Sequence, residues 1–341
     1  MKNDMKLLIT GGAGFIGSHV VEFFAENYPE YHIVVMDCLT YAANKDFWFE
    51  LGKGRYKNVE IFYGDIRKYY ACELIMKEAA IDAIIHLAAE SHVDNSILNP
   101  TEFVETNVMG TLNLLNAAKN AWGKPTVDNV FYHISTDEVY GHLGLDDHAF
   151  REDTAYDPRS PYSASKASSD HMVRAFHATH GLPILISNCS NNYGERQHPE
   201  KLLPKAITNL LTGKKIPVYG AGQNIRDWLY VGDHVKAIDT ILHYGRRGET
   251  YNIGGDSEIR NIDIVKDLIE IHLVDKVQDG EKIPFTSRYQ DYIKFVEDRK
   301  GHDFRYAINH DKLTRETGWK PTVGLREGLK ITYDYYKNKL K

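Results

Sequence analysis

A tyrosine and a lysine four residues apart, Tyr162 and Lys166, are the first candidates for chemistry in this sequence. On a helix, residues i and i+4 share a face, so the phenol and the ammonium would reach the same bound ligand. Ser160 and Pro161 before them are typical of a helix N-cap and first turn. A free tyrosine has a pKa of about 10, and we expect Lys166 to lower it toward a usable base. The alternative is an ordinary helix surface.

Two adjacent carboxyl groups, Asp137 and Glu138, follow a predicted buried strand that ends in Thr136. Like charges this close resist joint ionisation, so one carboxyl can stay protonated as an acid while its neighbour acts as a base. The Tyr/Lys pair could serve the oxidation of a carbinol carbon. An acid and a base next to such a pair suggest that the reaction also eliminates water. The alternative is a solvated turn, the usual interpretation of such a pair elsewhere.

A glycine-rich turn near the N-terminus predicts a nucleotide site. Gly11, Gly14 and Gly17 lie between an apolar run and a helical pattern, so the backbone can approach a diphosphate at a helix N-terminus. Asp37 ends the next apolar run, 20 residues beyond Gly17, a spacing at which a carboxylate binds an adenosine ribose. Its charge would repel a 2′-phosphate, which predicts NAD rather than NADP. The alternative is that Asp37 only caps the following turn.

These residues need a scaffold in which strands and helices alternate. Through the first 190 residues, short apolar runs alternate with helix-length segments, as in a parallel sheet covered on both faces. The predicted strands are 6–10, 32–37, 59–65, 83–89, 130–136 and 182–190, and the predicted helices are 15–28, 68–79, 101–122 and 161–180. The expected fold class is therefore α/β, with a doubly wound parallel (Rossmann) sheet.

After residue 190 the pattern changes, which predicts a smaller mixed α/β lobe. We expect an NAD-binding domain of residues 1–187 and 233–256, and a substrate-binding lobe of residues 188–232 and 257–341. Residues 191–197 are expected to form a loop and 251–253 a strand that returns to the sheet. The predicted helices of this part are 201–212, 231–244, 262–273 and 325–337.

Composition excludes several classes of protein. With 43% hydrophobic residues and a net charge of −6, the 341-residue chain is not predominantly disordered. Cys38, Cys72 and Cys189 are scattered, which suits a reducing, cytoplasmic compartment better than a disulfide scaffold. No apolar stretch predicts a membrane span, and the pI near 6.2 argues against nucleic-acid binding. The histidines lack metal-ligand spacing, so we expect no metal.

Together, the glycine-rich turn and the Tyr/Lys pair resemble the extended short-chain dehydrogenase/reductase family, which implies hydride transfer at a carbinol carbon. Further blocks, spread over residues 7 to about 320, are similar to the dTDP-glucose 4,6-dehydratases of that family. These blocks are residues 88–94, 136–138, 162–171, 187–194, 226–231 and 301–303.

The resemblance implies a redox-neutral cycle on a nucleotide sugar such as dTDP-glucose. Tyr162 would take the proton of the sugar 4-hydroxyl while hydride passes to NAD, and Thr136 would hydrogen-bond the C4 oxygen. Glu138 would then remove the C5 proton, which the new ketone makes acidic, and Asp137 would protonate the departing C6 hydroxyl. Return of the hydride to C6 leaves a 4-keto-6-deoxy sugar.

The resemblance also implies which residues bind the two ligands. Those expected at NAD are Gly11, Gly14, Phe15, Ile16, Gly17, Asp37, Thr40, Asp65, Ile66, Ala88, Ala89, Tyr162 and Lys166. Those expected at the nucleotide sugar are Ser91, His92, Asn191, Glu200, Lys201, Leu202, Pro204, Val218, Tyr219, Arg226, Asn261, Arg299 and His302. Arg226 suits a diphosphate because its guanidinium forks onto phosphate oxygens. The alternative for Arg226 is an internal ion pair, with Asp227 or another neighbour.

Some positions depart from the family pattern: Glu195, Arg196 and His198 stand where Pro, Tyr and Phe are common, and Cys38, Ala43, Lys300 and Phe304 differ from the usual motifs around them. They leave the preference for dTDP, UDP or CDP open. An epimerase or decarboxylase on the same scaffold is the closest alternative, disfavoured by Asp137 and Glu138. A non-catalytic NAD-sensing protein is another alternative, disfavoured because the Tyr/Lys pair is present. The resemblance further implies a homodimer packed through helices near residues 101–122 and 161–180.

Overall fold

A seven-stranded parallel sheet forms the centre of the larger lobe in the computed structural model, which describes residues 2–281, 288–298 and 301–340. Its order is β10-β6-β5-β4-β1-β2-β3. The strands are β1 (Lys6–Thr10), β2 (His32–Asp37), β3 (Val59–Tyr63), β4 (Ala83–His86), β5 (Val130–Thr136), β6 (Ile184–Cys189) and β10 (Thr250–Ile253). The order reverses between β1 and β4, which opens the crevice where doubly wound folds bind nucleotides. The predicted fold class is therefore confirmed.

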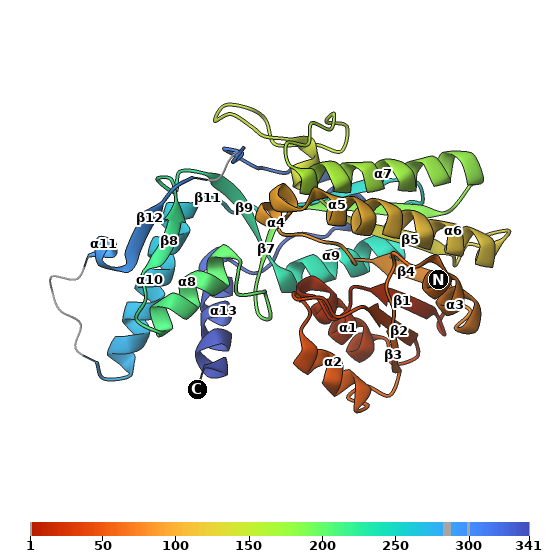
Figure 1. Ribbon diagram of the computed structural model, residues 1–341, viewed down its shortest axis with the longest axis horizontal. Helices are drawn as coiled ribbons and strands as arrows, with labels where there is room; N and C mark the ends of the chain where they lie inside the picture. Colours follow the sequence, from red (N-terminus) through yellow and green to blue (C-terminus); the bar gives the residue numbers. More distant parts are fainter. Residues whose placement is uncertain (1, 282–287, 299–300, 341) are drawn as a thin grey trace.

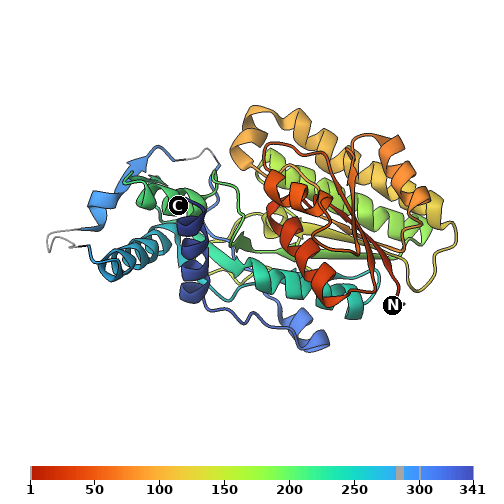
Figure 2. The same cartoon turned by 90° about the horizontal axis from the view of Figure 1, so that it is seen from below.

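Helices cover both faces of this sheet (Figures 1 and 2), because alternate residues of each strand are apolar on opposite sides. In β1, Leu7 and Ile9 face one core and Leu8 faces the other. The first core is covered by α1 (Phe15–Asn27), α2 (Lys45–Gly52), α9 (Val231–Tyr244) and α12 (Asp311–Thr317). The second is covered by α3 (Tyr69–Glu78), α6 (Thr111–Trp122) and α7 (Pro161–His180).

The helix predicted over residues 101–122 is interrupted by a wider turn. After α4 (Val93–Leu98), the chain runs through α5 (Pro100–Phe103) and a π-helical segment (Val104–Gly110) into α6. Within that segment, the buried Asn107 amide donates to the Glu90 carbonyl oxygen at 3.0 Å and to Ser165 Oγ at 2.8 Å, and accepts from the Glu90 N–H at 2.8 Å. The π turn therefore ties this helix to the loop after β4 and to α7.

The smaller lobe carries two small sheets and its own apolar core. One sheet has the order β11 (Glu258–Arg260), β9 (Ile225–Tyr230), β7 (Asn191–Tyr193), and the other pairs β12 (Ile293–Val296) with β8 (Ile216–Tyr219). Its helices are α8 (Leu202–Leu211), α10 (Asn261–Gln278), α11 (Tyr289–Tyr292) and α13 (Leu325–Lys339). Tyr193, Leu268 and Tyr333 are at the centre of its core.

The prediction of a loop for residues 191–197 is wrong for the first three residues, because Asn191–Tyr193 forms strand β7, which pairs with β9. Ser190 alone separates it from β6. Three residues are too few to show an alternating pattern, and asparagine is rare in strands, so the sequence gives no strand signal there.

The assignment of residues 257–341 to the smaller lobe is wrong for the segment 305–320. Leu313 and Trp319 lie in the same core as α1 and α9, and Tyr306 and Ile308 pack with Phe150 of the larger lobe. In Figure 2 this segment contains the blue helix at the bottom of the picture, apart from α13. Its helix has only seven residues, too short for a periodic pattern to show which core it joins.

The described residues show neither a membrane-spanning helix nor a metal cluster. None of their helices is long and apolar enough to cross a bilayer. They also bring together no group of three or more His, Cys, Asp or Glu side chains that could hold a metal ion. Cys38, Cys72 and Cys189 are free thiols.

Candidate active site

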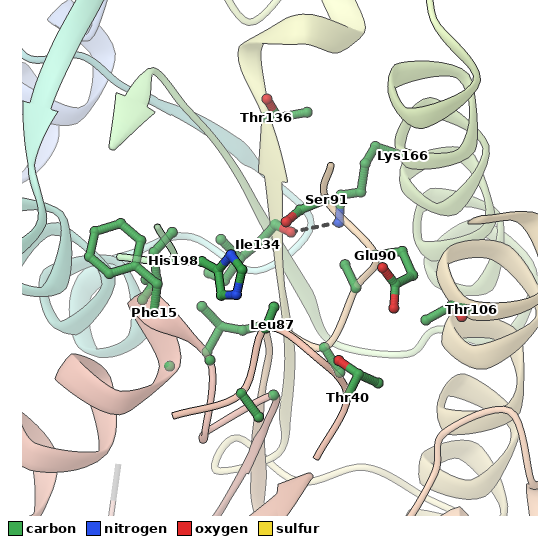
Figure 3. Close-up of a pocket in the computed structure, with 18 of the residues that line it drawn as sticks. Phe15, Thr40, Leu87, Glu90, Ser91, Thr106, Ile134, Thr136, Lys166 and His198 are labelled. Carbon is green, nitrogen blue, oxygen red and sulfur yellow. Dashed lines mark hydrogen bonds between the residues drawn. The ribbon is translucent and has the colours of Figure 1, made fainter. Parts of the chain in front are cut away.

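A pocket of about 320 Å³ lies at the carboxyl ends of the strands in the larger sheet (Figure 3). All residues predicted at NAD line it, from the glycine-rich turn to Ala88 and Ala89. So do the predicted catalytic residues Thr136, Asp137, Glu138, Tyr162 and Lys166. The fold therefore brings the nucleotide motif and the chemical motif into one cavity.

The glycine-rich turn before α1 leaves no room for side chains. Gly11 has a φ of +70°, and a Cβ there would lie 2.7 Å from the Ala88 nitrogen. A Cβ at Gly17 would overlap the Gly11 carbonyl oxygen. Gly14 is the N-cap of α1 and brings no side-chain cap, so the first N–H groups of this helix can receive an anion. The turn fits a dinucleotide diphosphate.

The structure shows Asp37 capping the turn, and the same carboxylate faces the pocket. Its Oδ2 accepts from the Ala13 N–H at 2.9 Å and its Oδ1 from the Leu39 N–H at 2.8 Å, so it does cap the turn. It also lines the pocket, and each carboxylate oxygen keeps a second lone pair for a ribose hydroxyl. Burial raises the pKa of Asp37, and the main-chain N–H groups act in the opposite direction.

Tyr162 and Lys166 lie in the first turns of α7. The predicted cap is present: Ser160 Oγ accepts from the Ser163 N–H and Ser163 Oγ accepts from the Ser160 N–H, both at 3.0 Å. Lys166 Nζ donates to the Ile134 carbonyl oxygen on β5 at 2.8 Å, the dashed line in Figure 3.

The expected lowering of the Tyr162 pKa counts on the positive nicotinamide ring of NAD as well as on Lys166, and the protein's own groups do not produce it. Burial, followed by the Glu138 carboxylate, raises the pKa of Tyr162 well above its usual value. A buried phenolate beside a carboxylate is disfavoured by both desolvation and repulsion. Sequence spacing shows that Lys166 is one turn away but cannot show how deeply the phenol is buried.

Asp137 and Glu138 begin a 3₁₀ turn (Asp137–Tyr140) directly after β5. Asp137 is buried, and its Oδ2 has no hydrogen-bond partner among the described residues. Burial and then the Glu138 and Asp227 carboxylates raise its pKa well above the usual range, so the neutral acid is favoured. Glu138 is half-buried. The pair thus offers a protonated acid next to a second carboxyl group.

The predicted substrate residues fall into two groups. Ser91, Asn191, Glu200 and Lys201 line the pocket. A second set does not line it: His92, Leu202, Pro204, Val218, Tyr219, Arg226, Asn261 and His302. Most of this set gathers at β8, β9 and the start of α10, where the Tyr219 and His302 rings meet edge to face at 6.3 Å. Arg299, like Lys300, lies outside the described residues.

Arg226 is buried without an ion pair in the part of the chain that the structure describes, so the ion-pair alternative is wrong. Its guanidinium donates to the carbonyl oxygens of Ile225 at 2.7 Å and Asp303 at 2.9 Å, and lies over the Tyr306 ring at 4.3 Å. Asp227 instead accepts from the main chain. The Arg226 charge acts to lower the pKa of Asp137, so the guanidinium is close enough to influence this carboxyl group.

Several polar pocket residues were not among the predicted site residues: Arg67, Glu90, Thr106, Ser135, Ser190, Asn192, Gln197 and His198. Burial and then the Glu102 charge raise the pKa of Glu90 to about 7. Glu90 stands between the predicted residues Ala89 and Ser91 in the loop that follows β4, and that position was the available signal. Figure 3 places Glu90 beside Thr106, with His198 and Phe15 across the pocket.

Two of the residues that depart from the family pattern, Glu195 and Arg196, join the two lobes. Arg196 donates to Glu22 Oε2 and contacts His19 Nδ1, both on α1 and both at 2.7 Å. The Tyr230 hydroxyl donates to the Glu195 carboxylate at 3.1 Å. These contacts hold the loop after β7 against the helix that follows the glycine-rich turn.

Comparisons with known proteins agree with this geometry. Residues 8–332 match the family model described as GDP-mannose 4,6 dehydratase. A dTDP-glucose 4,6-dehydratase of Shigella flexneri is 47% identical over 344 residues, which cover 97% of this chain and 92% of that protein. The similarity therefore spans both lobes.

Among solved structures, a dehydratase and an epimerase share this fold equally but differ in how similar their sequences are to this chain. The dTDP-glucose 4,6-dehydratase of Streptomyces venezuelae, solved with NAD bound, has a TM-score of 0.85 and 41% identity over 98% of this chain and 97% of its own. The UDP-glucose 4-epimerase of Thermotoga maritima also has a TM-score of 0.85, at 28% identity over 99% of this chain and 100% of its own. Both activities share the fold, and the sequence is closer to the dehydratases. The chain belongs to the extended short-chain dehydrogenase/reductase family and, within it, to the dTDP-glucose 4,6-dehydratases.

Proposed function

We propose that this protein binds NAD and converts dTDP-glucose to dTDP-4-keto-6-deoxyglucose, a hydro-lyase reaction of deoxysugar biosynthesis. The observation that carries the proposal is the buried acid Asp137 beside Glu138, in one pocket with Tyr162 and Lys166. The 47% identity to a dTDP-glucose 4,6-dehydratase over nearly the whole chain supports the choice of sugar nucleotide.

The glycine-rich turn and the free N–H groups of α1 would hold the diphosphate of NAD, and Asp37 would accept from its ribose hydroxyls. NAD, when bound, supplies the chemistry of accepting a hydride and giving it back. Lys166 would serve the second ribose with the N–H groups that face the pocket.

The catalytic side chains would move three protons. The positive charges of Lys166 and of the nicotinamide ring of NAD would together stabilise the Tyr162 phenolate against its buried surroundings. The phenolate would take the proton of the C4 hydroxyl while Thr136 hydrogen-bonds that oxygen, and the C4–H bond would give up its electron pair as hydride. The resulting ketone acidifies the C5 proton, which Glu138 removes. Asp137 protonates the C6 hydroxyl, which leaves as water, and hydride added to C6 together with a proton at C5 completes the product. The cycle is redox-neutral, so no external oxidant is needed.

We also propose how the nucleotide sugar lies. It extends from Asp137 and Glu138 past Asn191, Glu200 and Lys201, which line the pocket, toward Arg226. The other substrate residues proposed from the sequence, including Arg299, would contact its nucleotide end. The influence of the Arg226 charge on Asp137 supports this path, because a diphosphate bound at Arg226 would be close to the catalytic carboxyls.

An epimerase remains the alternative with a specific observation in its favour, the shared fold of the Thermotoga maritima enzyme. An epimerase oxidises and reduces the same carbon and needs no acid and base for water loss. The acidic pair at the end of β5 therefore favours the dehydratase.

We further propose that the protein is a cytoplasmic homodimer. Apolar side chains are exposed along α4 and the π-helical segment: Leu98 is 83%, Val104 48% and Met109 47% exposed. The exposed face of the adjacent α7 carries small residues, Ala164, Ser168 and Ala175, which permit close helix packing. The three free cysteines suit a reducing compartment.

The test is to incubate the purified protein separately with dTDP-, UDP- and CDP-glucose, without added NAD. Formation of 4-keto sugar is followed by its ultraviolet absorbance in alkali. We expect product from dTDP-glucose, made with NAD that co-purifies. A sugar inverted at C4 without loss of water would favour the epimerase. No product from any of the three donors, despite bound NAD, would favour a non-catalytic NAD-binding protein.

A further inference from the structure

Lys166 is buried in a setting that disfavours its charge. It is 4% exposed, its Nζ donates to the Ile134 carbonyl oxygen at 2.8 Å, and the same atom lies 3.4 Å from His133 Nε2. Burial lowers the pKa of Lys166, and the Asp170 charge is the first influence that raises it. A charged ammonium at this position therefore depends on a counter-charge.

Asp170, one turn later on α7, supplies that charge. It is completely buried, and its Oδ2 accepts from Ser135 Oγ and from the Tyr156 hydroxyl, each at 2.9 Å. Its Oδ1 lies 3.1 Å from His133 Nε2. Burial would raise the pKa of Asp170, but the adjacent His133 ring, the Lys166 charge and the Ser135 hydroxyl outweigh it, so the pKa is lowered. A carboxylate with two hydrogen-bond donors and these neighbours stays ionised inside the protein.

His133 stands between the two charges as a neutral ring. Burial and then the Lys166 charge lower its pKa to about 4. Nδ1 has no hydrogen-bond partner in the described part of the chain, whereas Nε2 faces the Asp170 carboxylate. The single ring proton therefore belongs on Nε2, which lies 3.1 Å from the Asp170 carboxylate and 3.2 Å from Ser169 Oγ. With that nitrogen occupied, Lys166 directs its N–H groups to Ile134 and to the pocket.

We propose that Asp170 is a positioning residue for the reaction, which acts through His133 to keep Lys166 charged and aimed into the pocket. Cys189 on β6 and His86 on β4 are the other titratable groups whose charges couple to Lys166. Burial raises the pKa of Cys189 to about 12 and lowers that of His86, so both stay neutral near pH 7. Asp170 is thus the compensating charge among these groups.

The same hydrogen bonds reach a second cavity on the far side of Asp170. The Tyr156 hydroxyl accepts from Arg174 Nη2 at 2.9 Å and from Asn188 Nδ2 at 3.2 Å while it donates to Asp170. Tyr156 and Arg174 line this cavity, which has a volume of about 350 Å³. Tyr156 is half-buried, so its hydroxyl can be removed without opening a void in the core.

The test compares Asp170→Asn with Tyr132→Phe. The control also removes a buried hydrogen bond, from the Tyr132 hydroxyl to Ser187 Oγ at 2.9 Å, but leaves Lys166 and its neighbours unchanged. For each protein, the pH profile of kcat with dTDP-glucose and the rate of NAD release after rapid filtration are measured. The second readout needs no turnover. The proposal rests on the proposed function for its substrate, and NAD release still tests Asp170 if dTDP-glucose is not turned over.

For Asp170→Asn we expect kcat at neutral pH to fall about tenfold or more, with its alkaline limb moved down by about one pH unit, because an uncompensated buried ammonium loses its proton earlier. NAD release should become faster than in wild type as the pH rises through the same range, since an uncharged Lys166 donates weaker hydrogen bonds to the ribose. Tyr132→Phe should keep the wild-type profile and release rate.

Tyr156→Phe gives a second measurement should Asp170→Asn not fold. Loss of one donor raises the pKa of Asp170, so the acid limb of kcat should move to higher pH while the alkaline limb stays in place. Superimposable profiles for wild type and variants would overturn the proposal. So would a loss in Asp170→Asn that is equal at every pH, because it would reflect packing alone.

Discussion

The two carboxyl groups at the end of β5 are adjacent in sequence but differ in surroundings. Asp137 is buried with an unpartnered oxygen among the described residues, whereas Glu138 is half-buried. The neutral form of Asp137 is therefore favoured by the fold, which suits a group that must give up a proton. The predicted division into acid and base has a physical cause in this difference.

Glu138→Gln and Asp137→Asn should each lower dehydration at least about a hundredfold while NAD remains bound, because each removes one proton transfer. The variants should differ in solvent exchange at C5. Asp137→Asn keeps the base and should incorporate deuterium at C5 of bound substrate, whereas Glu138→Gln should not. Full turnover by Glu138→Gln would contradict the assignment of the base.

Asp137→Asn should also stabilise the protein at neutral pH. The folded-state pKa of Asp137 is raised, so the unfolded chain releases this proton at lower pH and folding above pH 4 costs free energy. The neutral amide avoids that cost, and we expect a gain of about 1–3 kcal/mol at pH 7 that disappears as the pH falls through about 4. Thermal unfolding at both pH values measures it, and an equal effect at both would contradict the titration.

Asp37→Arg should move the cofactor preference toward NADP, since it exchanges a charge that repels the 2′-phosphate for one that attracts it. Because Asp37 also accepts from the Ala13 and Leu39 N–H groups, the neutral Asp37→Asn variant is needed to separate charge from turn stability. Equilibrium binding of both dinucleotides to the three proteins is the measurement. Unchanged NAD affinity in Asp37→Arg would remove this residue from the site.

Helix α7 carries the polar residues of the site one turn apart, at 162, 166, 170 and 174. The first two line the main pocket and the last lines the second cavity. Sequence spacing alone placed Tyr162 and Lys166 on one face, because the i, i+4 relation is local. It could not show that Asp170 meets His133, since that contact joins residues 37 positions apart on different elements.

Where the sequence around an element has a clear pattern, the first and last residues of that element were predicted correctly. The bounds of β1, β2, β5, α7 and α9 are those expected, because each has a continuous apolar run or a clear cap. The short strands β7, β8, β9, β11 and β12 were missed, since their pairing partners, not their own patterns, hold them in place. The substrate residues are consequently the part of the site that the sequence located least well.

Gly17→Ala should abolish NAD retention, because the new Cβ would overlap the Gly11 carbonyl oxygen and force the turn apart. Gly324→Ala is the control: this glycine is the N-cap of α13, and a Cβ there meets nothing within 4 Å. NAD content of the purified proteins, with their Tm values, distinguishes the two. Normal NAD content in a folded Gly17→Ala variant would contradict the diphosphate assignment.

The exposed apolar side chains on α4 and the π-helical segment form the proposed homodimer interface. Replacing Val104 and Met109 together by Asp should break the proposed homodimer, because two charges would be desolvated in the interface. Val127→Asp changes an apolar side chain that is 88% exposed after α6, away from these elements. Sedimentation velocity should give a monomer for the double variant and a dimer for the control. A dimeric double variant would exclude this surface.

Ser190 alone links β6 to β7, and Cys189, Ser190 and Asn191 all line the pocket, so the main chain itself passes from one lobe to the other inside the site. The chain crosses again near residues 231, 256, 304 and 321. No single cut therefore yields two modules. Recombination cannot graft a foreign substrate lobe onto this nucleotide domain in one exchange, and a new sugar preference must evolve by substitutions made in place.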